Sequence, residues 1–168
     1  MLTKRFVNLV TKKLIVNMES KLYGTRLYIS SSKLEHNVIF LKRHFNYTNL
    51  IAMVKANAYG YGDIGITQAL QNIGISIFGV ADFDEGLRLR KFGVKGSIMV
   101  MNPGLYNLQL IIENEMEPVI YNQETFLKLK QILENDKLNK TLPNKTIGIH
   151  IKVNTGMNRW GFNVPHLS

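Results

Sequence analysis

The chain has 168 residues, 45% of them hydrophobic, which is enough for one domain with its own core and excludes a disordered protein. It has no cysteine, which excludes a disulfide framework and a thiol nucleophile and agrees with a cytoplasmic location. The formal net charge is +9, but the basic residues form no stripe interleaved with aromatic residues, so we expect no nucleic-acid partner.

Residues 1–17 form an apolar and basic extension without acidic residues, which we expect to lie outside the fold. Its apolar runs are much shorter than the ~20 residues of a membrane span, so we expect no membrane partner. An organellar presequence is one interpretation, although serine is missing; a linker, or sequence read from an upstream start, is the other. We expect the domain to start at Met18 and to comprise residues 18–168.

The first predicted element after the extension is a helix. Serines at positions 30–32 offer its N-cap. Apolar residues then recur on one helical face; they are Leu34, Val38, Leu41 and Phe45. A strand is predicted over Leu50–Lys55. The next helix has its apolar stripe between Ile66 and Ile73 and ends at Gly74.

The strand–helix pattern then repeats. Strands are predicted over 75–81, 97–101, 118–121 and 146–153, and helices over 82–93, over 105–114 and after Asn122. Asp82 and Glu85 have the spacing of a capping box. Short apolar strands alternating with helices predict a parallel sheet with helices outside. About five such units without a Gly-x-Gly-x-x-Gly fingerprint favour a partial TIM-type (β/α) barrel, about five of its eight units, with an open sheet as the alternative.

A lysine ends the first predicted strand and opens a turn that contains glycines. The sequence at residues 55–62 is KANAYGYG. Ile51, Met53 and Lys55 share one side of the strand, which we expect to face the barrel interior. Lys55 can present its amine to a ligand or can simply be solvated. Tyr59 can bind a phosphate or pack in the core.

The last predicted strand alternates polar and apolar residues. Apolar side chains on one side would meet helices and polar ones on the other would face the barrel lumen; the apolar set is Ile149, Ile151 and Val153, and the polar set is His150, Lys152 and Asn154. A lysine in the lumen must be paired, neutralised or modified. Arg159 follows in a glycine-flanked loop, where a guanidinium suits a carboxylate or a phenolate.

Both stretches resemble the two signatures of the alanine racemase family, KANAYGYG from residue 55 and HIKVNTGMNRWGF from residue 150. These are pyridoxal-phosphate enzymes with an N-terminal β/α barrel. The resemblance runs from about residue 27 to the last residue and covers only the front part of such an enzyme. It implies pyridoxal 5'-phosphate as cofactor, a cytoplasmic homodimer, and interconversion of L- and D-alanine through an aldimine, which supplies D-alanine for cell-wall peptidoglycan.

The resemblance assigns roles to four residues and implies no metal. Lys55 would bind the cofactor aldehyde and be one of two acid–base groups at the substrate α-carbon. Tyr59 would contact the cofactor phosphate, and Arg159 would lie beside the ring hydroxyl and the substrate carboxylate. Lys152 matches a lysine that is carbamylated in many members; pairing with a barrel carboxylate is the alternative.

The chain also departs from the family pattern. Asn154 stands where the family usually has aspartate, and Trp160 where it usually has leucine. A serine or broad-specificity racemase would share these motifs, so the substrate stays open. A non-catalytic pyridoxal-phosphate-binding barrel would lack the block at 155–157. Since an incomplete barrel leaves apolar strand edges unpaired, we expect the isolated 168-residue chain to be inactive and to self-associate.

Overall fold

A computed structural model of the chain describes residues 27–46, 49–139 and 146–163. The extension at residues 1–17 and the expected start at Met18 therefore lie outside the described residues. Within them the chain alternates between strands and helices, which confirms the predicted α/β class.

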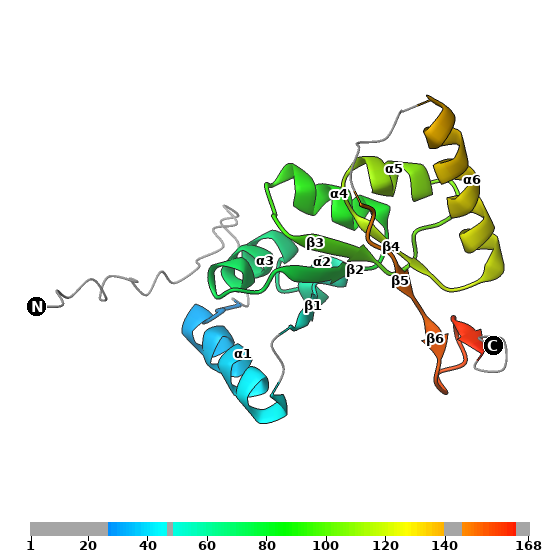
Figure 1. The fold of residues 1–168 in the computed structure, drawn as a ribbon. Coiled ribbons are helices and arrows are strands. Elements are labelled where there is room, and N and C mark those ends of the chain that lie inside the picture. The colour runs from blue at the N-terminus through cyan, green and yellow to red at the C-terminus, as the bar shows by residue number, and fades with distance from the viewer. Residues whose placement is uncertain (1–26, 47–48, 140–145, 164–168) are drawn as a thin grey trace, which may run out of the picture.

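One parallel sheet of five strands forms the centre of the fold (Figure 1). The strands are β1 (Ile51–Met53), β2 (Ile77–Val80), β3 (Ser97–Val100), β4 (Glu117–Ile120) and β5 (His150–Ile151). Their order in the sheet, β1-β2-β3-β4-β5, is their order in the chain. A dinucleotide-binding sheet reverses direction part-way through its strand order, whereas a β/α barrel adds each new strand beside the last. The topology is therefore that of part of a barrel.

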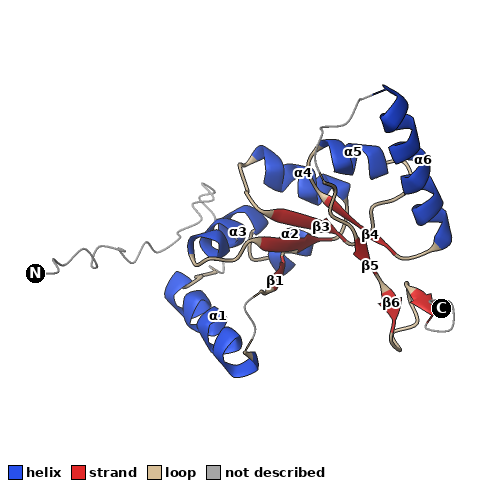
Figure 2. Cartoon of the chain, viewed as in Figure 1, coloured by secondary structure: helices blue, strands red, loops and turns tan. Residues whose placement is uncertain are grey.

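Helices follow the strands and flank the sheet (Figure 2). They are α1 (Ser31–Phe45), α3 (Asp63–Asn72), α4 (Phe83–Lys91), α5 (Leu108–Glu113) and α6 (Gln123–Asn139), together with the short α2 (Lys55–Tyr59). In Figure 1, α3 to α6 line one side of the strands, while α1 lies beyond β1. Within the described ranges, no helix has both the length and the apolar character needed to cross a membrane.

Apolar side chains between the strands and the helices form two clusters. The larger one contains Phe78, Leu89 and Ile98, which have no solvent exposure. The second joins α5, β4 and α6. Each of β2, β3 and β4 buries three consecutive residues, as expected for parallel strands covered on both faces. The inner strands are therefore the best packed part of the fold.

The edge strand β5 is less covered than its sequence predicts. Ile149 and Ile151 were expected to meet helices, but they are 42% and 63% exposed. That prediction is wrong, because α6 packs over β4 and α5 and no described helix follows β5. The predicted apolar face of α1 is also only partly buried. Val38 is buried, whereas Leu41 and Phe45, nearer the end of the helix, are exposed.

Helix caps agree with the sequence. The Oγ of Ser30 accepts a hydrogen bond from the Lys33 amide at 3.3 Å, and the Oδ1 of Asn122 accepts one from the Thr125 amide at 2.8 Å. Each cap satisfies an amide that the first turn of a helix leaves without a backbone partner.

Candidate active site at the carboxyl ends of the strands

Lys55 lies at the carboxyl end of β1, but it is not a strand residue. β1 ends at Met53, and the buried Val54 leaves the extended region with φ −119° and ψ 15°. The Val54 amide still donates to the carbonyl of Gly79 on β2 at 2.9 Å. The chain turns immediately afterwards, so the predicted strand Leu50–Lys55 is too long, and Lys55 is instead the first residue of α2.

The turn after Lys55 has the opposite hand to an ordinary helix. Ala56, Asn57 and Ala58 have φ between 50° and 55° and ψ between 45° and 50°, and Tyr59 has φ 54°. The amide of Gly60 donates to the Ala56 carbonyl at 3.0 Å, which closes a left-handed turn. Each non-glycine residue in this conformation costs about 1–2 kcal/mol, so the four cost about 4–8 kcal/mol. Strain of this kind persists only where surrounding contacts enforce it, and it is frequent at functional sites.

Side chains of α3 and α4 supply such contacts. One carboxylate oxygen of Glu85 accepts from the Ala56 amide at 2.7 Å, and the other accepts from the Ala81 amide at 2.7 Å. Asn57 accepts from the Asp63 amide at 3.0 Å, and the buried Asp63 carboxylate pairs with Arg88. Thus α4 holds the start of the turn, directly through Glu85 and indirectly through Arg88 and Asp63.

These contacts correct the predicted capping box. Asp82 caps α4 as expected, since its Oδ1 accepts from the Glu85 amide at 3.1 Å. Glu85, however, does not return to the Asp82 amide. It bonds to the amides of Ala81 and Ala56 instead, so half of the predicted box is replaced by a contact between neighbouring strand ends.

The turn leaves its functional groups free. Lys55 is half-buried, and Tyr59 is 60% exposed and does not pack in the core. Within the ranges that the structure describes, neither the Lys55 amine nor the Tyr59 hydroxyl has a hydrogen-bond or ion-pair partner. An amine and a phenol are therefore presented to a ligand from one rigid turn.

The second stretch forms a folded loop at the other edge of the sheet. The predicted strand over 146–153 is broken into β5 and β6 (Val153–Asn154), and β6 pairs with β7 (Phe162–Asn163). The Lys152 amide donates to Ile120 of β4, and the Lys152 carbonyl accepts from the Phe162 amide, both at 2.9 Å. The chain thus changes its pairing partner at Lys152, which is why one continuous strand was the wrong prediction.

Lys152 itself is half-buried. No described carboxylate lies within ion-pair distance of its amine. The carboxylate that does face β5, Glu117, bonds instead to His150 at 2.7 Å. Carbamylation of Lys152 stays a prediction.

Asn154 holds the loop that carries Arg159. Its Oδ1 accepts from the amides of Gly156 at 3.2 Å and Asn158 at 3.0 Å. Its Nδ2 donates to the Oδ1 of Asn158 at 2.9 Å and of Asn163 at 3.0 Å. An aspartate could make the first two bonds but not the last two. The family usually has aspartate at this position, but here the side-chain oxygens of Asn158 and Asn163 need a hydrogen-bond donor, which asparagine supplies and aspartate does not.

We expect Asn154→Asp to loosen this loop. The substitution sets a carboxylate oxygen against two amide oxygens, and each lost bond is worth about 0.5–1.5 kcal/mol. Amide hydrogen exchange at Phe162, whose amide donates to the Lys152 carbonyl across the loop, should become faster, as measured by NMR. Asn37→Asp, on the exposed side of α1, adds the same charge and serves as the control. Equal exchange rates in the loops of both variants would contradict the assignment.

Arg159 belongs to an aromatic cluster that the sequence did not reveal. Its guanidinium carbon lies 5.5 Å from the Trp160 ring centroid. Trp160 stacks on Tyr121, with centroids 5.0 Å apart and an interplanar angle of 14°. The Tyr121 hydroxyl donates to Asn102 Oδ1 at 3.1 Å. Asn102 directly follows the predicted strand over 97–101, and Tyr121 is the last residue of the predicted strand over 118–121; these positions were the signal that could have identified them.

Burial, reinforced by the nearby Glu124 carboxylate, raises the pKa of Tyr121 above 10.0. The folded state therefore holds the phenol proton more tightly than the unfolded chain does. Stability from neutral Tyr121 is complete below about pH 10 and is lost as the pH rises through its higher folded pKa. In urea titrations, the stability advantage of the wild type over Tyr121→Phe should shrink above about pH 10. An advantage that does not change with pH would contradict this.

The two halves of the candidate site lie at the same end of the sheet but at opposite edges. Lys55 and Tyr59 follow β1, whereas Arg159 lies beyond β5, with three strands between. The structure does not bring Lys55 and Arg159 into contact. In a barrel, the carboxyl ends of the strands carry the active site, so both halves are placed where such a site is built.

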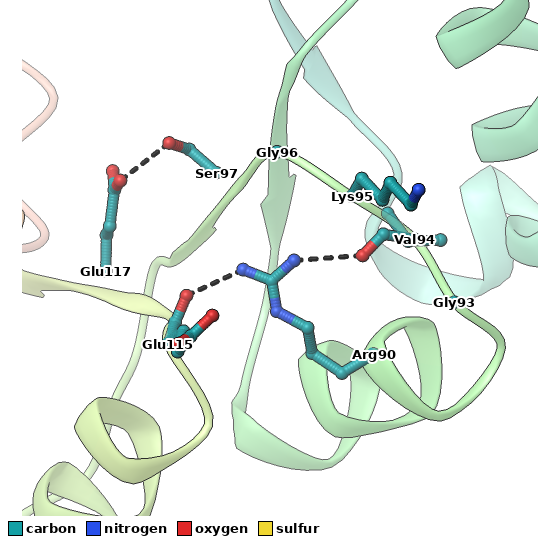
Figure 3. A pocket seen from close by; sticks show the side chains of 8 residues that line it. All are labelled: Arg90, Gly93, Val94, Lys95, Gly96, Ser97, Glu115 and Glu117. Atoms are coloured by element: carbon teal, nitrogen blue, oxygen red, sulfur yellow. Dashed lines mark hydrogen bonds between the residues drawn. The ribbon is translucent and has the colours of Figure 1, made fainter. Parts of the chain in front are cut away.

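A pocket of about 460 Å³ lies at the opposite, amino-terminal end of the strands (Figure 3). Arg90 crosses it and donates to the carbonyls of Val94 at 2.9 Å and Glu115 at 2.6 Å. Burial lowers the pKa of Arg90, and the Glu115 and Glu117 carboxylates oppose that shift. Ser97 donates to Glu117 at 2.6 Å. Arg90, Ser97 and Glu117 in this pocket are thus engaged in bonds within the protein, and the amino end of a barrel contributes stability rather than catalysis.

Comparison with known proteins identifies the fold. Residues 29–167 match a family model described as "Alanine racemase, N-terminal domain". The alanine racemase of Fusobacterium nucleatum is 34% identical over 140 residues, which cover 83% of this chain and 37% of that protein. The alanine racemase of Mannheimia succiniciproducens is 33% identical over 143 residues, which cover 83% of this chain and 37% of that protein. The chain thus spans about 37% of the length of these curated relatives.

Solved structures agree. The alanine racemase of Acinetobacter baumannii superposes with a TM-score of 0.67 at 30% identity, over 82% of this chain and 39% of that one. The histidine racemase of Leuconostoc mesenteroides superposes with a TM-score of 0.69 at 26% identity, over 79% of this chain and 34% of that one. Both the family match and the strand order support one assignment: this chain belongs to the alanine racemase family and corresponds to part of its N-terminal β/α barrel domain.

Proposed function

We propose that this chain provides the lysine-bearing part of the active site of a pyridoxal-phosphate-dependent alanine racemase. The observation that carries the proposal is the position of Lys55. Its amine stands without a partner among the described residues, at the carboxyl end of β1, on a strained turn that packing enforces. The family membership supports the same assignment.

The residues of the turn fit pyridoxal phosphate. An aldehyde needs a primary amine, and a phosphate accepts hydrogen bonds from a phenol. Lys55 and Tyr59 supply these two groups, and an added Cβ at Gly60 or Gly62 would meet nothing within 4 Å, so the turn is open on that side. When bound, the cofactor supplies a ring that withdraws electrons from the α-carbon of an amino acid.

The protein's own residues then have separate tasks. Lys55 would hold the aldehyde and, as an amine, exchange a proton with one face of the substrate α-carbon. Tyr59 would hold the phosphate. Arg159 would pair with the substrate carboxylate, since a guanidinium binds carboxylates with two parallel hydrogen bonds. The contacts of α3 and α4 behind the turn hold the backbone that carries Lys55 and Tyr59.

Alanine is the substrate we propose, because the curated relatives at 34% and 33% identity are alanine racemases. The histidine racemase shares the fold, so another amino acid is the second candidate. Trp160 favours a small substrate, since its stacked ring stands beside Arg159 and takes up space there. We also propose a cytoplasmic homodimer, as implied by the family.

A hybrid protein tests the proposal. The hybrid joins this chain to the remainder of the Acinetobacter baumannii alanine racemase. Chiral chromatography of products from L-alanine, L-serine and L-histidine in the presence of pyridoxal phosphate gives the turnover of each. We expect D-alanine to form fastest. Preference for histidine would favour the second candidate, and a folded, cofactor-loaded hybrid without racemisation of any of the three would contradict the proposal.

A further inference from the structure

We propose that Glu85 is a positioning residue for Lys55: its carboxylate clamps the strand ends of β1 and β2 and thereby orients the lysine. The inference rests on the proposed function of Lys55. It concerns a residue of α4 that no motif of the family signature contains and that would touch neither cofactor nor substrate.

The clamp is made of two short hydrogen bonds from one side chain. Oε1 of Glu85 accepts from the Ala56 amide and Oε2 from the Ala81 amide, each at 2.7 Å. Ala56 comes three residues after the last residue of β1, and Ala81 directly follows β2. Hydrogen bonds to a charged acceptor are shorter and stronger than neutral ones. Glu85 thus joins two neighbouring strands just where their backbone ladder ends.

The Ala56 bond acts directly on the lysine. The amide of Ala56 belongs to the planar peptide unit that links it to Lys55. The peptide unit on the other side of Lys55 is also held, because the Val54 carbonyl accepts from the Ala58 amide at 2.9 Å. With both flanking peptide planes fixed, the direction of the Lys55 Cα–Cβ bond is fixed too.

Glu85 is itself held in place. Its amide donates to the Asp82 cap, which sets the first turn of α4. Arg88, three residues on, lies on the same helical face and pairs with Asp63, whose amide donates to Asn57 of the turn. α4 therefore contacts the left-handed turn in two ways. Glu85 bonds to it directly, and Arg88 pairs with Asp63, which in turn bonds to Asn57.

Glu85→Gln is the sharpest test on the full chain, because it keeps the size of the side chain. Glutamine has one acceptor oxygen for two amide donors, so one of the two bonds is lost. Asp84→Asn is the matched control: it makes the same change from carboxylate to amide in the first turn of the same helix, at an exposed side chain, and leaves the Glu85 carboxylate and the Asp82 cap in place. Residue-resolved amide exchange by NMR and thermal unfolding are measured for both variants and the wild type.

We expect amide exchange at Ala56 or Ala81 to become about tenfold faster in Glu85→Gln, in line with the strength of a hydrogen bond to a charged group. The second readout is the fraction of pyridoxal phosphate fixed on Lys55 by borohydride, measured across pH. That fraction should fall in Glu85→Gln and stay at the wild-type level in Asp84→Asn.

The outcomes are separable. Unchanged exchange at both Ala56 and Ala81 in Glu85→Gln overturns the clamp. Faster exchange with unchanged Lys55 labelling, or an equal loss of labelling in Asp84→Asn, overturns the positioning role. A wild-type chain without selective label on Lys55 contradicts the proposed function rather than the clamp, which amide exchange then decides alone.

Discussion

Lys55→Ala in the hybrid protein is expected to lower kcat/KM for alanine by at least about 10²–10⁴-fold, the typical contribution of one acid–base group. The loss should be larger than this range if the amine also binds the aldehyde, because covalent attachment disappears with it. The reason is structural: the only amine on the left-handed turn is that of Lys55. Chiral chromatography of D-alanine formation measures the effect.

Lys91→Ala is the control for this experiment. Lys91 is an exposed lysine at the end of α4, well outside the turn. It should leave turnover and folding unchanged, since surface substitutions of this kind usually change stability by less than about 0.5 kcal/mol. Wild-type turnover in Lys55→Ala would show that another lysine does the chemistry.

Arg159→Ala has the second largest expected effect. Removing one oriented donor to a charge in an active site typically costs about 10²–10³-fold in kcat. Folding should be nearly unaffected, because Arg159 is exposed and its described contact is to the neighbouring Trp160 ring. Arg159→Lys keeps the charge but loses the planar fork, so it should recover only part of the activity.

Trp160→Leu separates the role of Arg159 from that of its aromatic neighbour. Leucine removes the stacking on Tyr121 but keeps the guanidinium. We expect this variant to retain more activity than Arg159→Ala. If the leucine variant were the more impaired of the two, the aromatic stack rather than the guanidinium would carry the function.

The sequence was sufficient to predict the strands, since each is a short apolar run bounded by turn residues. The predicted positions for β2, β3 and β4 differ from the observed ones by at most two residues at an end. The caps at Ser30, Asp82 and Asn122 were also predicted correctly, because a cap depends on local spacing alone.

Features that depend on contacts between distant residues were missed. The local sequence did not predict a left-handed turn at residues 56–59, since these four residues include no glycine. The turn is enforced by Glu85, which is 29 residues away from Ala56. The break at Lys152 and the stack of Trp160 on Tyr121 have the same origin. The candidate site residues lie in these stretches, where contacts between distant residues override the local backbone preference.

Peptide mapping after borohydride reduction tests the central claim most directly. The full chain is mixed with pyridoxal 5'-phosphate, reduced, digested and analysed by mass spectrometry, with Lys55→Ala treated in parallel. The position of Lys55 on the enforced turn predicts a pyridoxyl label at Lys55 that exceeds the label on every other lysine and is missing in the variant. A label that is strongest on Lys152, or spread evenly over the surface lysines, would contradict the assignment of Lys55 as the cofactor-binding residue.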